Sequence, residues 1–135
     1  MMSERYRRGV DMVQQLSSGS LEKFLKTSRI AEVAPEFARM VIEFVFGDLY
    51  SRETLALRDR EIAAIASLAS LGHAGPQLRT HIEAAQRLGL SRAEIVEILM
   101  QIGIYSGLPN ALNALADCHD LLAEGDCVPC RTCQA

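Results

Sequence analysis

The middle of the chain, residues 57–109, repeats apolar positions at the spacing of α-helices. Between residues 59 and 71 this spacing predicts a helix with one apolar stripe, formed by Ile62, Ile65, Ala66 and Ala69. Gly72 and Gly75 bracket a break, and Pro76 suits the first turn of a second helix. The apolar stripe of this second helix includes a histidine and consists of Leu78, His81, Ile82 and Ala85.

Helix-end signals predict two more helices after this pair. Gly89 supplies a left-handed stop, and Ser91 with Glu94 forms a capping box that opens the third helix. The apolar stripe of the third helix is Ile95, Val96, Leu99 and Ile102, and the helix ends within residues 105–109. A last helix is expected from residue 108 or 109 to about Ala123, ended by Gly125, with an apolar side of Leu112, Leu115, Ala116 and Leu122.

The N-terminal part of the sequence carries the same kind of helix-end signals, and these predict shorter helices. Ser3 caps a helix through about Leu16, and Ser20 caps a short helix over residues 21–26. Pro35 opens a further helix whose expected buried side is Phe37, Met40, Val41, Phe44 and Val45. Residues 47–54 are expected to be a connector, and Tyr50 within it is expected to be packed.

Composition supports one all-α domain of about six to seven helices over residues 1–123, followed by a cysteine-rich tail over residues 124–135. The chain has 135 residues, of which 49% are apolar and only 5% aromatic. The net charge of −3 gives no support for nucleic-acid binding. No apolar run approaches the ~20 residues needed to span a bilayer, and no secretory signal is visible, so a cytoplasmic location is expected.

Four cysteines lie in the last eighteen residues, at Cys118, Cys127, Cys130 and Cys133. Their spacing suits a zinc site, with Cys118 or His119 as the fourth ligand. It also suits a redox pair whose thiolate is favoured by Arg131. The third interpretation, thiols without a fixed role in a flexible terminal extension, is the simplest. The sequence leaves these alternatives open, and we expect no metal.

Four motifs in the middle of the chain, in this order and spacing, resemble the carboxymuconolactone decarboxylase family, which also contains alkyl hydroperoxidase D. They are Arg60-Glu61-Ile62, Leu78-Arg79-x-His81, Gly89-Leu90-Ser91-x-x-Glu94-Ile95 and Tyr105-x-Gly107-x-Pro109-x-Ala111. Arg8-Gly9 and the segment from Glu43 to Tyr50 resemble its decarboxylase branch. The resemblance covers roughly residues 5–122 and implies a helical protomer of the alkyl hydroperoxidase D type, assembled as a trimer or hexamer.

The resemblance also implies a reaction, the conversion of 4-carboxymuconolactone to 3-oxoadipate enol-lactone and carbon dioxide in aromatic catabolism. The hydroperoxidase branch carries a Cys-x-x-Cys pair a few residues before the histidine, but residues 72–77 contain no thiol here. Peroxide reduction by that mechanism needs a thiolate nucleophile, so the decarboxylase branch is favoured. No cofactor is expected, because the conjugated lactone itself accepts the electron pair.

His81 is the candidate proton donor, since a histidine changes charge near neutral pH and this one lies on an apolar stripe. Without the resemblance, a core histidine bonded to a backbone carbonyl would be the better interpretation. Glu61 is the second candidate catalytic residue, because a neighbouring carboxylate orients an imidazole and favours its charged form. Helix-dipole stabilisation in a first turn explains Glu61 almost as well.

The planar guanidinium group of arginine binds a carboxylate through two hydrogen bonds. Arg58, Arg60 and Arg79 are therefore candidate clamps, side chains that would hold the carboxylates of the substrate. Each is otherwise a surface residue or an ion-pair partner, for example Arg79 with Glu83. Twelve of the fourteen basic residues are arginine, which codon bias explains more simply. Two further candidate substrate contacts are His73, otherwise a surface loop residue, and Tyr105, otherwise an anchor of the helix end.

Three functions therefore remain as hypotheses. The first is a lactone decarboxylase that needs neither metal nor thiol. The second is a thiol-dependent peroxidase or disulfide reductase that uses the C-terminal cysteines. The third is a non-catalytic helical oligomer built on the same scaffold.

Overall fold

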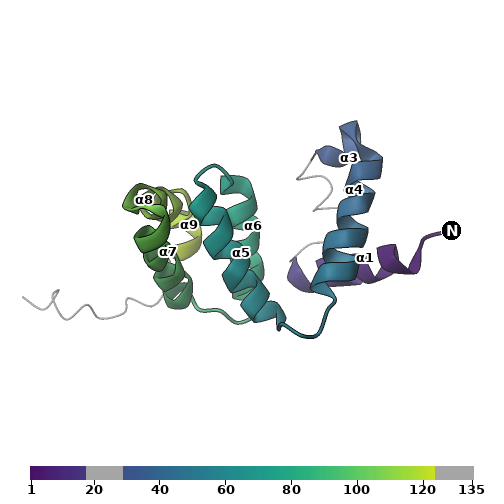
Figure 1. The fold of residues 1–135 in the computed structure, drawn as a ribbon, viewed down its shortest axis with the longest axis horizontal. Helices are drawn as coiled ribbons and strands as arrows, with labels where there is room; N and C mark the ends of the chain where they lie inside the picture. Colours follow the sequence, from purple (N-terminus) through teal and green to yellow (C-terminus); the bar gives the residue numbers. More distant parts are fainter. Residues whose placement is uncertain (18–28, 124–135) are drawn as a thin grey trace, which may run out of the picture. The chain divides into compact units, whose positions relative to one another are not determined.

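The computed structural model describes residues 1–17 and 29–123, and these residues form helices without any strand (Figure 1). The all-α prediction is confirmed. The helices are α1 (Glu4–Leu16), α3 (Ile30–Val33), α4 (Pro35–Val41), the π-helix η1 (Ile42–Tyr50), α5 (Leu57–Leu71), α6 (Gly75–Arg87), α7 (Arg92–Ser106), α8 (Leu108–Asp117) and α9 (His119–Leu122). The predicted short helix over residues 21–26, its cap Ser20, and the stop at Gly125 lie outside the described residues.

The chain divides into two compact units, Met1–Arg60 and Glu61–Ala135. Helix α5 begins in the first unit and continues into the second. No helix within the described residues is long and apolar enough to cross a membrane. The predicted domain boundary at residue 123 stays a prediction.

The first unit is built on a close contact between α1 and η1. Ser3 caps α1 as predicted, accepting a hydrogen bond from the backbone N–H of Tyr6. A Cβ atom at Gly9 would lie 2.2 Å from the carbonyl oxygen of Ile42, and one at Gly47 would lie 2.3 Å from the carbonyl oxygen of Arg5. Both positions therefore require glycine, and the two helix backbones touch there.

Two predictions in this unit are wrong. Residues 47–50 are helical, because the helix that opens at Pro35 continues as η1, and the connector covers only residues 51–56. On the expected buried side, Phe37, Met40 and Phe44 are exposed, whereas Ala38 and Ile42 are buried. The helix is apolar on two sides, and its small residues allow the close approach to α1, so side-chain size misidentifies the inner side.

The second unit has a single apolar core in which side chains from α5 to α8 interlock. Its buried members are Ile65, Ala69, Leu78, Ile82, Ala85, Leu90, Ile95, Leu99, Ile102, Ala111, Ala114 and Cys118. The predicted helix ends are confirmed: Gly72 and Gly89 have positive φ angles of 76° and 95°, and the capping box of Ser91 and Glu94 has both hydrogen bonds.

The predicted last helix is two helices, α8 and α9, which meet at Cys118. Leu112 and Ala116, expected on its buried side, are exposed, whereas Ala111 and Ala114 are buried. Leu115 and Leu122 pack partly against the core, as expected. Gly103 explains the difference, because a Cβ atom there would lie only 3.2 Å from the Ala111 Cβ, and such a close helix contact selects small residues.

Candidate functional site

Glu61 and His81 form a hydrogen-bonded pair between α5 and α6. The His81 Nδ1 atom lies 2.7 Å from the Glu61 Oε2 atom. Glu61 is on the same side of α5 as Ile65 and Ala69, four and eight residues further on, so the helix carries its carboxylate toward the core. The Glu61 side chain is 0% exposed and that of His81 is 24% exposed. The pair thus joins a buried carboxylate to an imidazole that solvent reaches.

The hydrogen-bonding pattern defines what each group can do. An ionised carboxylate only accepts hydrogen bonds, so Nδ1 of His81 donates to Glu61 and the Nε2 atom remains for a ligand. The second carboxylate oxygen, Glu61 Oε1, is buried and has no hydrogen-bond partner within the described residues. A buried acceptor without a partner is costly, so this oxygen offers a place for a donor from a ligand or a water molecule.

Arg79 forms an ion pair with Asp120 on α9. Its Nη1 and Nη2 atoms donate to the two carboxylate oxygens of Asp120 on α9, at 2.7 and 2.6 Å, and Nη1 also donates to the Asp117 carbonyl oxygen at 2.8 Å. The hydrogen bond from Arg79 lowers the pKa of Asp120 to about 2, and the same bond raises the pKa of Arg79. The suggested partner Glu83 is replaced by Asp120, because a bidentate pair matches the guanidinium fork better than a helical neighbour does.

The other two candidate clamps lie in the first turn of α5, within the first unit. Arg58 is exposed. The Nη2 atom of Arg60 donates to the Arg52 carbonyl oxygen at 3.3 Å, and its guanidinium carbon lies 5.9 Å from the centre of the Tyr50 ring. The Arg60 Nε atom is buried and has no partner among the described residues. Arg60 therefore retains an unused donor.

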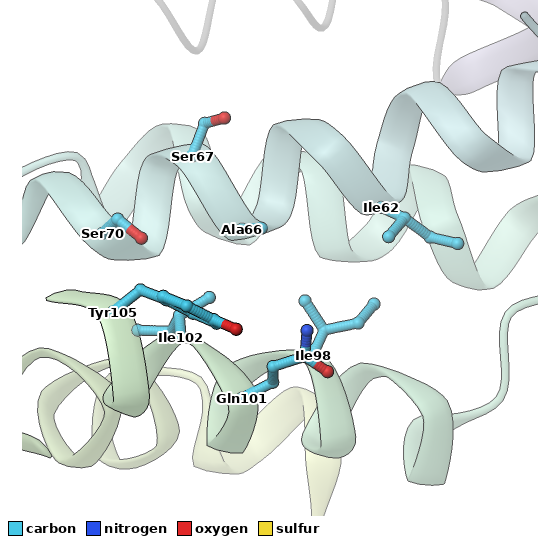
Figure 2. Close-up of a pocket in the computed structure, with 8 residues that line it drawn as sticks. All are labelled: Ile62, Ala66, Ser67, Ser70, Ile98, Gln101, Ile102 and Tyr105. Carbon is cyan, nitrogen blue, oxygen red and sulfur yellow. The ribbon is translucent and has the colours of Figure 1, made fainter. Parts of the chain in front are cut away.

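A groove of about 480 Å³ runs between α5 and α7 and carries no charged side chain (Figure 2). Of the predicted site residues, only Tyr105 lines it, and 84% of this residue is exposed. His73 is exposed in the turn between α5 and α6. The complete lining is Ile62, Ala66, Ser67, Ser70, Ile98, Gln101, Ile102 and Tyr105.

The groove was missed by the sequence analysis, although the sequence holds a signal for it. No charged residue occurs between Ile62 and Gly72 of α5 and its turn, nor between Ile98 and Ala116 of α7 and α8. A helix that faces water on one side normally carries charges there. Their absence is the signal in the sequence for an uncharged surface beside this groove.

Cysteine chemistry gains no support from the described residues. Cys118 is fully buried in the core, and burial raises the pKa of its thiol, which disfavours the reactive thiolate. Its position is also unsuited to the zinc site considered above. Cys127, Cys130 and Cys133 lie outside the described residues. In residues 1–17 and 29–123, no group of three or more His, Cys, Asp or Glu side chains is arranged to hold a metal ion.

Comparisons with known proteins agree with the resemblance seen in the sequence. The model of the carboxymuconolactone decarboxylase family matches residues 35–116, a range that contains both Glu61 and His81. A 4-carboxymuconolactone decarboxylase from Acinetobacter baylyi is 27% identical over 108 residues, which are 78% of each chain. An uncharacterized 15.0 kDa protein from the nqo9–nqo10 intergenic region of Paracoccus denitrificans is 30% identical over 96 residues, 70% of this chain and 72% of its own.

Proposed function

The chain belongs to the carboxymuconolactone decarboxylase family, and we propose on this premise that it decarboxylates a carboxylated lactone such as 4-carboxymuconolactone. The observation that carries the proposal is the 2.7 Å hydrogen bond between a fully buried Glu61 and the partly exposed His81. The pair supplies the proton that such a reaction consumes. The expected pathway is the breakdown of aromatic compounds.

The reaction breaks one carbon–carbon bond and forms one carbon–hydrogen bond. Loss of carbon dioxide from the substrate carboxylate leaves an electron pair, which spreads into the unsaturated lactone as a dienolate. Protonation of one carbon of this dienolate then gives the enol-lactone. The lactone is its own electron sink, so the protein has to bind the substrate, stabilise the developing negative charge and deliver a proton.

His81 is proposed to deliver that proton from Nε2. In the imidazolium form both ring nitrogens carry hydrogen, with Nδ1 held by Glu61 and Nε2 left for the substrate. The positive ring is also proposed to stabilise the dienolate. After transfer the ring is neutral, and solvent returns the proton through the exposed edge of the side chain.

Glu61 is proposed to position His81 through the hydrogen bond to Nδ1. This hydrogen bond fixes the orientation of the ring and leaves Nε2 for the substrate. The unpartnered Oε1 atom accepts a hydrogen bond from the substrate or from a bound water molecule.

Substrate carboxylates need cationic partners, and Arg58 and Arg60 remain the proposed clamps. Arg60 has an unpartnered buried Nε atom that suits such a role. Arg79 is proposed instead to hold α9 on α6, because Asp120 occupies both of its terminal nitrogens. His73 and Tyr105 as substrate contacts, a trimeric or hexameric assembly and a cytoplasmic location stay predictions.

An ultraviolet assay with purified protein and 4-carboxymuconolactone tests the proposed reaction. The assay is run alone, with a metal chelator, and with a thiol-blocking reagent. We expect turnover in all three conditions, because the lactone accepts the electron pair and His81 supplies the proton. Absence of turnover in every condition would refute this substrate, and loss of turnover only with the thiol blocker would favour the C-terminal cysteines.

A further inference from the structure

The groove between α5 and α7 is lined by one face of each helix. On α5 the lining side chains Ile62, Ala66 and Ser70 lie one helical turn apart, which places them on the same side of the helix. On α7, Ile98 and Ile102 are also one turn apart, and Figure 2 shows the two rows pointing toward each other. The groove volume of about 480 Å³ lies within the ~300–1,000 Å³ that small-molecule sites occupy.

Asn110 on α8 ties the two helices to each other at one end of the groove. Its Nδ2 atom donates to the Ser70 carbonyl oxygen at 3.0 Å and to the Ser106 carbonyl oxygen at 3.3 Å. Ser70 lies in the last turn of α5, and Ser106 is the last residue of α7. Because one amide group holds both helix ends, the groove exists before any ligand binds, and a preformed site needs little ordering on binding.

Three uncharged polar groups stand along the apolar rows of the groove. They are the hydroxyl groups of Ser70 and Tyr105 and the side-chain amide of Gln101. In the part of the chain that the structure describes, none of these three side-chain groups has a hydrogen-bond partner. Figure 2 shows the Tyr105 ring lying along the groove, where a flat ligand would stack on it. The groove therefore offers hydrogen bonds and apolar contact without any charge.

We infer that this groove binds an uncharged ring compound that carries a hydroxyl, carbonyl or amide group. A carboxylate is disfavoured, because no cationic side chain lines the groove and the burial of an unpaired charge is costly. Neither Glu61 nor His81 lines the groove, and the substrate proposed above carries carboxylates. The inference therefore does not depend on the proposed decarboxylase activity.

Methyl NMR of the full chain, labelled at the isoleucine δ1 carbons, tests the inference directly, because Ile62, Ile98 and Ile102 line the groove. The probes are 4-hydroxybenzamide and 4-hydroxybenzoate, which share the ring and the hydroxyl group and differ in charge. We expect the amide, added up to about 5 mM, to shift these three signals, and the carboxylate to bind at least about 10-fold more weakly. The signals of Ile42 and Ile82, which are buried elsewhere, should not shift.

Gln101→Lys places a cation in the groove and should tighten the binding of 4-hydroxybenzoate about 10-fold. Gln77→Lys is the matched control, because it adds the same charge at an exposed position of α6 that does not line the groove. We expect this control to bind both probes as the wild type does. Gln77 and Gln101 are both exposed, so helix content by circular dichroism should not change in either variant.

The inference would be overturned if the highest concentration of the amide left the signals of Ile62, Ile98 and Ile102 unchanged. Equal affinity of the wild type for the two probes, or an equal gain in both lysine variants, would also overturn it. So would a shift of the same three signals when the free protein is diluted, because a second copy of the chain would then fill the groove.

Discussion

Each of the two units of the chain is held together internally in a different way. In Met1–Arg60, the helices touch backbone to backbone at Gly9 and Gly47, and charged side chains on the surface join them. Arg5 on α1 pairs with Asp48 on η1 at 2.6 Å, for example. From Glu61 onward, apolar side chains of four helices interlock in one core. The closest backbone contacts at glycine thus lie in the first unit, whereas the second unit is built around one core cluster of apolar side chains.

The difference also concerns where charge is placed. The pairs of Arg5 and Arg8 with Asp48 in the first unit are partly exposed, and pairs near the surface contribute little to stability. The second unit encloses one charged side chain, Glu61, among the described residues, and His81 is its partner. A buried carboxylate is costly unless it is paired, so its presence in this unit favours a role in chemistry over a role in stability.

The largest expected effect concerns that buried carboxylate. Glu61→Gln keeps the shape of the side chain but removes its charge, so the imidazolium form of His81 loses its counter-ion. We expect kcat to fall about 100-fold with little change in KM. Glu83→Gln is the matched control, because Glu83 is exposed on α6, and it should keep wild-type activity. Equal activity of Glu61→Gln and Glu83→Gln would show that the buried carboxylate has no special role in the reaction.

The next effect concerns the backbone contact of the first unit. Gly9→Ala introduces a Cβ atom where the Ile42 carbonyl oxygen would be 2.2 Å away, so α1 and η1 must separate. We expect a loss of about 2 kcal/mol or more in the free energy of unfolding. In the second unit, Gly75 has no neighbour within 4 Å of a built Cβ atom. Urea unfolding of Gly75→Ala should therefore show no loss in the free energy of unfolding. A loss as large as that of Gly9→Ala would contradict the claim that the close contact at Gly9 causes the effect.

The smallest effect concerns the surface pair of the second unit. The hydrogen bond from Arg79 lowers the pKa of Asp120 to about 2. A lowered carboxyl pKa stabilises the fold above pH ~4, and the stabilisation is lost as the pH falls toward 2. Asp120→Asn should therefore lower Tm by about 1–3 °C at pH 7 and lose this difference at pH 2. A difference that persists at pH 2 would show that the pair acts through packing.

Local signals predicted where helices begin and end. Ser3, Pro35, Gly89 and the capping box at Ser91 each act through neighbours within four residues, and the structure has all of them as expected. Burial was predicted well on α5, α6 and α7, for example for Ile65, Ala85 and Leu99. At α4 with η1 and at α8, close contacts select small residues, and an apolar pattern does not reveal which side of such a helix is inside.

The candidate site was predictable in part. The place of His81 in an apolar stripe and the family resemblance pointed to Glu61 and His81, which the structure brings within hydrogen-bonding distance. The partner of Arg79 lies 41 residues away at Asp120, and no local spacing indicates it. The groove beside Tyr105 likewise depends on how α5 and α7 face each other. Contacts between distant segments are the part that the sequence alone does not show.

The most direct test of the account is the turnover of 4-carboxymuconolactone by His81→Ala beside His119→Ala. His119 is exposed on α9 and has no proposed role in the reaction. If His81 delivers the proton, kcat falls by about 10² to 10⁴ in His81→Ala and is unchanged in His119→Ala, while both variants keep the helix content of the wild type. Wild-type turnover by His81→Ala would contradict the central claim that the buried Glu61 acts through His81.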